Sequence, residues 1–311
     1  MRNITNLRSP ECPTVRQRAL AFGGRVLRRA RATLGHAQRR RWKTRLLFRI
    51  RNRLLRDKPI SIRVGGTSLS LAPTGAMAAN YWTGPRSEKH QLKFLLQSLQ
   101  PGHIFFDVGA NAGPFAIAAA NKIGQPGVYA FEPCEERFQL LRRNLELNGV
   151  TRLAAIRTAL GDYVGNTVLH AGSGHVEGAS KLAGPNHTTG LAARQESVPI
   201  TTLDAFMEAN AIPRMDAMKV SVEGAELLVF QGSRNLLERS DAPLILFEAS
   251  GSKTSRFGYH PVETLWFLTD RGYSMFILDP DTGTITARRP DGRFDALVVA
   301  AKPNHLMGLK L

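Results

Sequence analysis

One segment restricts the fold of this chain more than any other, because an apolar stretch runs directly into a glycine-rich turn. Residues 105–114 read FFDVGANAGP. A strand-like run leads into a turn with two glycines, and Pro114 stands where a helix would begin. Gly109 and Gly113 let the backbone approach a ligand without a Cβ atom in the way. This order predicts a β-strand, a ligand-facing turn and a helix whose first N–H groups suit an anionic group.

Strand-like and helix-like segments alternate along the chain around this turn. The strand-like segments are residues 103–108, 128–132, 154–159, 217–222, 243–248, 274–278 and 296–300. Helical patterns fit between most of them, which predicts an α/β, Rossmann-like fold with a doubly wound, mainly parallel sheet. Only a short polar stretch joins the last two segments, so we expect a C-terminal antiparallel strand there.

Three other stretches have patterns of their own. Residues 60–71 alternate like a hairpin with a Gly-Gly turn. Leucines at positions 92, 95, 96 and 99 mark an amphipathic helix that ends before Pro101. Residues 170–197 are rich in Gly, Ser, Thr and His, and they predict a surface insertion rather than a core element.

The positive charge of the chain is concentrated at its beginning. The net charge is +17, but residues 1–58 hold 18 Lys or Arg and only two acids, so the remainder carries a net charge of about +1. Leu47, Ile50 and Leu54 recur at helical spacing within this arm, which predicts a basic amphipathic helix. We therefore expect a basic Arg-rich extension over residues 1–58 and one domain over residues 59–311. The extension is interpreted as a leader whose last helix packs on the domain, with docking to an anionic membrane or another polyanion as the alternative.

Composition excludes several classes of protein. At 43% apolar residues the chain can bury a sizeable core. No apolar run approaches the roughly 20 residues that span a bilayer, so we expect no transmembrane helix. The two cysteines, Cys12 and Cys134, indicate neither a metal cluster nor a disulfide framework. These features predict a cytoplasmic protein, with peripheral membrane association through the arm as an open alternative.

Acidic residues follow the first and second strands of the predicted domain at the spacing of a nucleotide site. Glu132 lies 23 positions after Gly109, close to the roughly 20 expected for the acid that binds ribose hydroxyls. Asp107 ends the first strand, and Asp162 follows the third, where it could accept the amino group of adenine. A dinucleotide site would place a glycine at position 111, whereas Asn111 offers an amide to a small zwitterion. The pattern therefore favours S-adenosylmethionine over NAD.

The motifs together resemble the FkbM-type methyltransferases, a family of class I S-adenosylmethionine-dependent enzymes. The resemblance extends over about residues 60–302 and rests on DVGANAG (107–113), FEP (131–133), ALGD (159–162), TLD (202–204) and VEGAE (222–226). It implies the class I methyltransferase fold and O-methylation, often of hydroxyls on sugars or secondary metabolites. Position by position, it implies that the cofactor is held by Asp107, Gly109, Asn111, Gly113, Glu132 and Asp162.

The chain departs from the family pattern at one position. The family usually reads KIDVEG, and residues 219–224 read KVSVEG, so Ser221 replaces an aspartate at the end of the fourth strand. Serine is a poor base and a poor ligand for a hard cation. We therefore predict that the protein binds no metal at this site. The replacement also raises the alternative of a methyltransferase-like binding protein with impaired catalysis.

Two acids on the fourth and fifth strands are the candidates for the acceptor side. Glu223 and Glu248 follow adjacent predicted strands, at the carboxyl edge where doubly wound sheets bind ligands. An alcohol acceptor benefits from a base, and we predict Glu223 as the base or acceptor-orienting group. Glu248 and Lys219 are lesser candidates. Glu248 could instead bond backbone amides, and Lys219 could be a buried structural lysine paired with an acid.

The predicted function is S-adenosylmethionine-dependent O-methyl transfer to a hydroxyl of a small molecule, sugar or glycan. An RNA or protein methyltransferase that grips a polyanion with the basic arm is a further alternative. The nearly neutral domain and the lack of interleaved basic and aromatic residues disfavour a nucleic acid partner.

Overall fold

The computed structural model describes residues 58–64, 67–72, 87–171, 181–182, 194–280, 282–287 and 295–306. The chain divides into two units, Met1–Leu54 and Leu55–Leu311, and every described residue belongs to the second. Apart from Lys58, the basic extension and its expected amphipathic helix lie outside the described residues. The boundary at residue 58 therefore stays a prediction.

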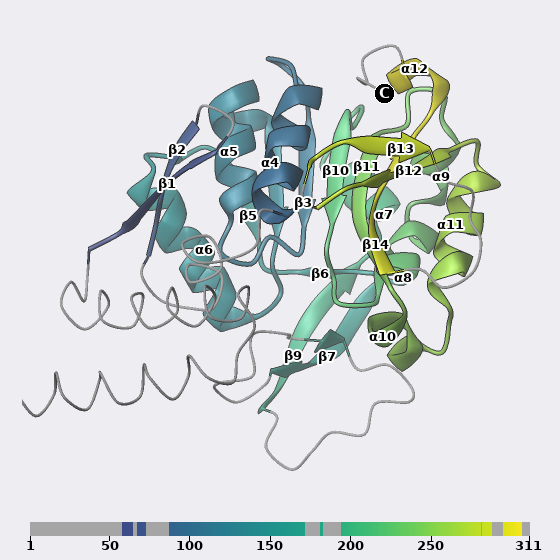
Figure 1. Ribbon diagram of the computed structural model, residues 1–311. Helices are drawn as coiled ribbons and strands as arrows, with labels where there is room; N and C mark the ends of the chain where they lie inside the picture. Colours follow the sequence, from purple (N-terminus) through teal and green to yellow (C-terminus); the bar gives the residue numbers. More distant parts are fainter. Residues whose placement is uncertain are drawn as a thin grey trace, which may run out of the picture. The chain divides into compact units, whose positions relative to one another are not determined.

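An eight-stranded sheet with the order β13-β12-β14-β11-β10-β3-β4-β5 forms the centre of the described unit (Figure 1). Its five parallel strands are β5 (Ala154–Ile156), β4 (Val128–Phe131), β3 (Phe105–Val108), β10 (Ala217–Val220) and β11 (Leu244–Ser250). Three strands run antiparallel to their neighbours: β14 (Asp295–Ala301), β12 (Ser274–Leu278) and β13 (Ile285–Ala287). The predicted α/β fold, with its mainly parallel sheet and antiparallel C-terminal strand, is confirmed. The sequence did not predict the short strand β13, because the residues around it are mostly polar.

Helices cover both faces of this sheet. The first face carries α4 (Ser87–Ser98) and α5 (Pro114–Ile123), and α6 (Glu135–Leu147) connects β4 to β5. The second face carries α7 (Leu203–Ala209), α8 (Glu226–Gln231), α9 (Arg234–Glu238) and α11 (Pro261–Thr269). Shorter elements are η1 (Gln125–Gly127), α10 (Gly251–Thr254), η2 (Ser255–Phe257) and α12 (Pro303–Leu306). Among the described residues, no helix has the length and apolar character needed to cross a membrane.

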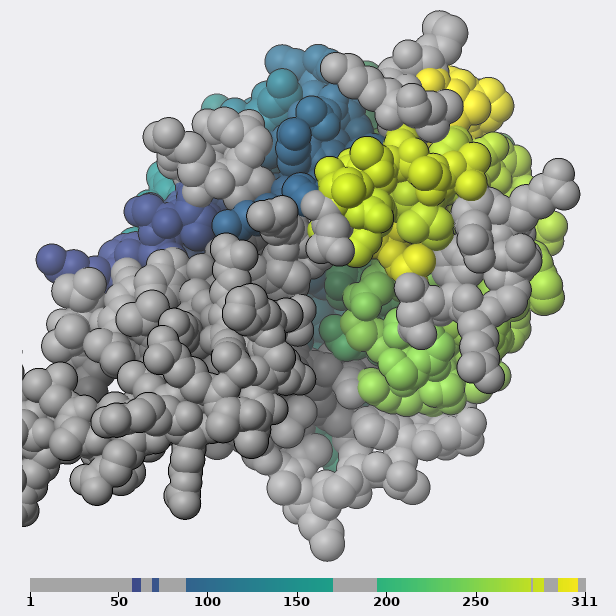
Figure 2. All heavy atoms as spheres, viewed as in Figure 1, coloured from purple at the N-terminus to yellow at the C-terminus, as the bar shows by residue number. Residues whose placement is uncertain are grey.

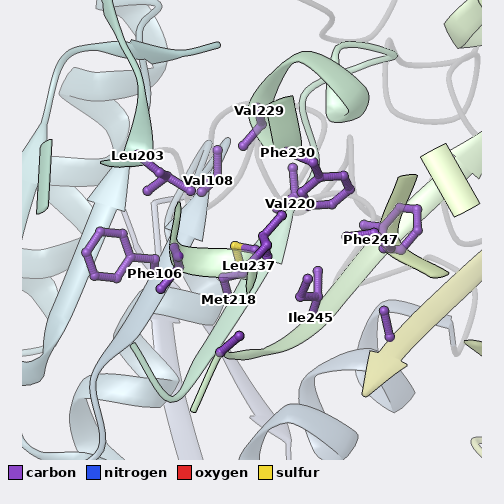
Figure 3. Packing of buried hydrophobic residues seen from close by; sticks show 14 of the residues in the cluster. Phe106, Val108, Leu203, Met218, Val220, Val229, Phe230, Leu237, Ile245 and Phe247 are labelled. Carbon is purple, nitrogen blue, oxygen red and sulfur yellow. The ribbon is translucent and has the colours of Figure 1, made fainter. Parts of the chain in front are cut away.

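Alternation along the strands separates an apolar face of the sheet from a face that carries charges. Phe106, Val108, Met218, Val220, Ile245 and Phe247 point toward the second face and pack with Leu203, Val229, Phe230 and Leu237 (Figure 3). The intervening residues point the other way because successive strand side chains alternate. Asp107 and Lys219 are among them, and they are partners in the register of β3 and β10. The charged side chains of Asp107 and Lys219 therefore lie on the face of the sheet that α4 and α5 cover.

Two sequence predictions near the edges of the domain are confirmed. Strands β1 (Ile60–Val64) and β2 (Thr67–Leu71) pair antiparallel, as expected for the arms of a hairpin. Leucine-bearing α4 ends at Ser98, before Pro101 as expected.

A second sheet, which the sequence did not predict, borders residues 170–197. Within that range the side chains at 195–197 are described and are not buried, as expected for a surface segment. The four strands of this sheet have the order β6 (Ala159–Leu160), β9 (Arg194–Thr201), β7 (Gly165–Ala171) and β8 (Lys181–Leu182). Val198 and Ile200 on β9 are buried in a small core with Leu169 and Cys134. The polar composition concealed these strands, because each exposes one face and only alternate residues are apolar.

Candidate active site

The predicted glycine-rich turn follows β3, and its backbone is left-handed at three positions. The φ angles are 78° at Gly109, 51° at Asn111 and 81° at Gly113, and Pro114 begins α5. A Cβ atom at Gly109 would collide with the carbonyl oxygen of Ser221, and one at Gly113 with the side chain of Leu141. Packing within the protein therefore requires both glycines, whether or not they also make room for a ligand.

The Glu132 side chain, at the end of β4, connects this turn to the residues after β4 through hydrogen bonds. One carboxylate oxygen accepts a hydrogen bond from the Asn111 N–H at 2.9 Å, and the other accepts from the Cys134 N–H at 3.0 Å. The side chain is only 3% exposed, and burial raises the pKa of Glu132, with Arg137 and the two N–H groups opposing the shift. A carboxylate has about four acceptor positions, so two remain for ligand hydroxyls. The donor and acceptor set of the turn and Glu132 thus fits the ribose and the zwitterionic end of S-adenosylmethionine.

Asp107 and Lys219 form a buried pair beneath the turn. The Lys219 Nζ lies 3.5 Å from Asp107 Oδ1 and 4.8 Å from the centre of the Phe115 ring. Asp107 has no exposed surface and also accepts a hydrogen bond from the Ala116 N–H at 3.1 Å. Burial raises the pKa of Asp107, and Lys219 and the Ala116 N–H counteract that shift. Lys219 therefore has the structural pairing that the sequence left open as an alternative to a catalytic role.

Asp162 follows β6 and is exposed, with its neighbour Gly161 donating a backbone hydrogen bond to Thr201 at 3.0 Å. The structure therefore does not bring Asp162 into the buried network of Asp107 and Glu132. Its predicted contact with adenine stays a prediction.

The acceptor-side candidates lie at the carboxyl ends of two neighbouring strands, as predicted. Ser221 directly follows β10 and its N–H bonds the Val108 carbonyl at 2.9 Å. Glu223 lies two residues further on, and Glu248 belongs to the adjacent parallel strand β11. Lys253 of α10 lies between the two acids, with Nζ 2.8 Å from Glu248 Oε2 and 3.4 Å from Glu223 Oε1. Burial opposes the charge of Lys253, but the two glutamates outweigh it and raise the pKa of the amine.

The turn that carries Glu223 is held by two groups that the sequence reasoning did not single out. Glu223 has a φ of 58°, rare for a residue with a side chain. The Glu226 carboxylate accepts hydrogen bonds from the N–H groups of Val222 at 3.1 Å and Gly224 at 3.4 Å. The Tyr259 hydroxyl donates to the Gly224 carbonyl and accepts from the Leu227 N–H at 3.2 Å. Glu226 stands in the VEGAE block and was available to sequence reasoning, whereas Lys253 and Tyr259 are brought in only by folding.

A small cavity of about 30 Å³ opens at this edge of the sheet on the face that α4 covers. It is lined by Gln91, Lys219, Val220, Ser221, Leu246, Phe247, Glu248 and Leu297. The structure therefore gathers three of the four acceptor-side candidates, Lys219, Ser221 and Glu248, around one space. Glu223 is linked to that space through Lys253. Within the described residues, no group of three or more His, Cys, Asp or Glu side chains could hold a metal ion.

A parallel sheet with a glycine-rich first turn and a buried acid after the second strand defines a Rossmann-like nucleotide-cofactor protein. Residues 107–275 match the methyltransferase FkbM domain. The match covers more than half of the 311 residues, and the chain belongs to this family of methyltransferases. The predicted cofactor, S-adenosylmethionine, is confirmed by this membership.

Curated relatives cover part of the chain. Hexuronic acid methyltransferase AglP of Haloferax volcanii is 28% identical over 155 residues, which are 49% of this chain and 59% of that protein. Methyltransferase 1 of Beauveria bassiana is 29% identical over 142 residues, 40% of this chain and 56% of that protein. The chain thus spans less than two thirds of the length of these two relatives.

Solved structures with similar folds include two further methyltransferases. Precorrin-6y C5,15-methyltransferase of Geobacter metallireducens has a TM-score of 0.38 and 15% identity, covering 69% of this chain and 88% of that one. The tRNA (uracil-54, C5)-methyltransferase of Pyrococcus abyssi has a TM-score of 0.39 and 16% identity, covering 78% and 44%. Similarities of this size do not bear on the acceptor.

Proposed function

We propose that the protein transfers a methyl group from S-adenosylmethionine to a hydroxyl oxygen of a small molecule, sugar or glycan. The observation that carries the proposal is the cavity at the carboxyl edge of β10 and β11, which has Ser221, Lys219 and Glu248 in its lining. Hydroxyl groups both donate and accept hydrogen bonds, so carboxylates and a serine hydroxyl suit them. AglP, a hexuronic acid methyltransferase by name, lends support to a sugar acceptor.

The cofactor side of the proposal assigns the turn and its neighbours to S-adenosylmethionine. Asn111 and the helix-opening N–H groups after Gly113 would bind the zwitterionic end, and Glu132 the ribose hydroxyls. Asp107 would support the turn through the Ala116 N–H, and Asp162 would contact adenine from the surface. When bound, the cofactor supplies a methyl group already activated on a sulfonium. The remaining task of the protein is to align the acceptor and exclude water.

On the acceptor side, we assign Glu223 to orient the hydroxyl and take up its proton. The Lys253 ammonium forms ion pairs with both Glu223 and Glu248 and so holds the two acids side by side. The ionised form of a carboxylate is the one that can take up the proton of an alcohol. Ser221 can add one hydrogen bond but no negative charge. Glu223, which the family pattern shares, and Glu248 are therefore the acids left at this edge where Ser221 replaces the family aspartate.

The test is methyl transfer from labelled S-adenosylmethionine to pooled neutral sugars, glycosides and small alcohols, followed by mild alkali. A methyl ether survives alkali, whereas a methyl ester is hydrolysed. We expect alkali-stable label with the parent protein and a rate about 100-fold lower with Glu223→Gln. Glu208→Gln, at an exposed position of α7, is the matched control and should leave the rate unchanged.

Two results would contradict the proposal. A parallel pool of uronic acids supplies carboxylate acceptors, and label that alkali releases from that pool, with none in the neutral pool, would show that the acceptor is a carboxylate. Calorimetric binding of S-adenosylmethionine without any labelled product would favour a binding protein with impaired catalysis, the alternative that Ser221 raises.

A further inference from the structure

One helix places a carboxyl group over the charged face of the sheet. The second residue of α4 is Glu88, and Gln91, three positions later, lines the cavity beside Lys219 and Glu248. Residues three apart on a helix lie on the same side, so Glu88 and Gln91 both face the sheet. His90 of α4 also contacts the C-terminal part of the domain, because its Nδ1 lies 3.1 Å from the Pro280 carbonyl oxygen. In Figure 2 the blue atoms of α4 accordingly lie next to the yellow-green atoms of the C-terminal strands.

Glu88 interacts electrostatically with the charged groups of the cavity. Burial is the main cause that raises the pKa of Glu88, while the charge of Lys219 lowers it and the charge of Glu248 raises it. Lys219 and Glu248 both line the cavity, so the Glu88 carboxyl interacts with two charged groups of its lining. Two charged residues, Lys219 and Glu248, line the cavity, and Glu88 stands three positions before Gln91, which also lines it.

One oxygen of Glu88 lacks a hydrogen-bond partner. Among the described residues, Glu88 Oε2 is buried and accepts or donates no hydrogen bond. Buried polar atoms in native proteins are nearly always paired, because an unpaired one loses its bonds to water without replacement. An unpaired buried oxygen beside a cavity is therefore a candidate for a partner that arrives with a ligand.

The size of the cavity indicates what that partner is. A volume of about 30 Å³ matches the space of a single water molecule. It can admit one hydroxyl group, while the rest of an acceptor molecule stays outside. A hydroxyl would satisfy Glu88 Oε2 whether the carboxyl is ionised or protonated, because it can both donate and accept.

Charge further restricts the acceptor. Lys219 is already paired with Asp107, and Lys253 with Glu223 and Glu248. A carboxylate that entered the cavity would meet Glu88 and Glu248 with both of these cations engaged. Like charges at short range in a partly buried site oppose each other strongly.

On the basis of the proposed function, we propose that Glu88 binds a hydroxyl of the acceptor and selects uncharged polyhydroxy compounds over their carboxylate counterparts. The role is one of binding and specificity. It assigns to α4 a part of the acceptor site that no motif of the chain marks.

The first test requires no ligand. The variant Glu88→Gln removes the titratable carboxyl from a buried position and keeps the shape of the side chain. Glu136→Gln is the matched control, because Glu136 is also in the first turn of a helix but is exposed. We expect the melting temperature of Glu88→Gln to be no lower than that of Glu136→Gln, since Glu88 Oε2 has no bond to lose. A clearly lower value would show that the Glu88 carboxylate is structural and would overturn the proposal.

The second test measures selectivity with methyl β-D-glucopyranoside and its C6-oxidised counterpart, the methyl glucopyranosiduronate. Binding is followed by saturation-transfer NMR in the presence of S-adenosylhomocysteine, and methylation is followed with labelled cofactor. We expect the parent to prefer the neutral sugar at least about tenfold, and Glu88→Gln to reduce that ratio about tenfold through tighter binding of the uronate. Glu136→Gln should keep the ratio of the parent.

The outcomes separate this inference from the proposed function. A selectivity ratio that is the same in the parent and in Glu88→Gln would overturn the role of Glu88, even if both proteins methylate sugars. No methylation of any hydroxyl compound by the parent would count against the proposed function, and the melting comparison would still decide whether the Glu88 carboxylate is structural.

Discussion

At the scale of single residues, Glu132 joins the sequence pattern most directly to ligand binding. Its carboxylate accepts two backbone hydrogen bonds, one from the N–H of Asn111 in the cofactor turn and one from the N–H of Cys134 after β4. Removing the carboxylate would strand these two amides and take away the acceptor proposed for the ribose. Structural and ligand-binding roles thus meet in one side chain.

Glu132→Ala should therefore weaken the binding of S-adenosylmethionine by about 1–3 kcal/mol, because charged acceptors of hydrogen bonds contribute that much. Isothermal titration calorimetry measures the loss directly. Glu136→Ala, at an exposed position nearby, serves as the control. An affinity equal to that of the parent would remove Glu132 from the cofactor site.

Glu226 is the residue whose protonation should affect stability in the neutral range. Burial raises the pKa of Glu226 from 4.5 to about 7, against the opposing effect of its backbone hydrogen bonds and Lys253. The folded protein therefore holds a proton between about pH 4.5 and pH 7 that the unfolded chain has released. Stability then falls as the pH rises through this window, because the folded state binds more protons than the unfolded state.

We expect the unfolding free energy of the parent, relative to Glu226→Gln, to decrease from pH 5 to pH 7 and to level off above pH 7. The slope should be at most about 1.4 kcal/mol per pH unit. Denaturant melts of both proteins at pH 5, 6, 7 and 8 provide the difference, in which other titrating groups cancel. A difference that does not change with pH would show that Glu226 titrates normally.

At the scale of elements, the turn from β10 to α8 determines how the acceptor side is built. Gly224 has a φ of 108°, and a Cβ atom there would lie 2.6 Å from the carbonyl carbon of Lys253. The turn and α10 are therefore in backbone contact, which explains how Lys253 comes to lie between Glu223 and Glu248. The close approach needs a residue without a side chain.

Gly224→Ala should be markedly more destabilising than Gly102→Ala. Gly102 has a φ of 81° but open space around its Cβ position, so alanine there meets only the left-handed penalty of about 1–2 kcal/mol. Alanine at position 224 also collides with Lys253, which should add about 1–3 kcal/mol. Denaturant melts of the two variants measure the difference, and equal losses would contradict the close packing of the turn against α10.

At the scale of the whole molecule, charge and folded structure are separated along the chain. The first 58 residues carry nearly all of the net charge of +17, and the described residues lie almost entirely beyond them. We propose that this extension contacts anionic membrane surfaces and that the remainder folds without it. Each Lys or Arg close to an anionic membrane surface contributes about 1 kcal/mol to the free energy of binding.

Deletion of residues 1–40 should leave the melting temperature and the affinity for S-adenosylmethionine unchanged. It should reduce cosedimentation with vesicles that contain phosphatidylserine, and the binding of the full chain should weaken with salt. Neutral phosphatidylcholine vesicles are the control. Equal retention of both proteins would contradict the membrane proposal, and a truncated protein that does not fold would contradict the boundary at residue 58.

The sequence by itself determined the order along the chain of the strands of the central sheet apart from β13, the turn at residues 107–113, and the neighbouring ends of β10 and β11. These features depend on local rules: apolar periodicity, glycine and proline at turns, and the adjacency of carboxyl ends in a parallel sheet. The cap of α11 is equally local, since the His260 side chain, just before Pro261, accepts a hydrogen bond from the Val262 N–H. Residues close together in the sequence are enough to predict such features.

Only the tertiary structure decided which side chains gather near the acceptor cavity. Glu88 of α4, Lys253 of α10 and Tyr259, which precedes α11, are far from β10 in sequence, and nothing in their local patterns marks them. The second sheet was missed for the same reason, because the burial of Val198 and Ile200 depends on packing against Cys134 and Leu169. Long-range packing brings these groups together, and the alternation of strand residues does not specify which helix will cover a given face.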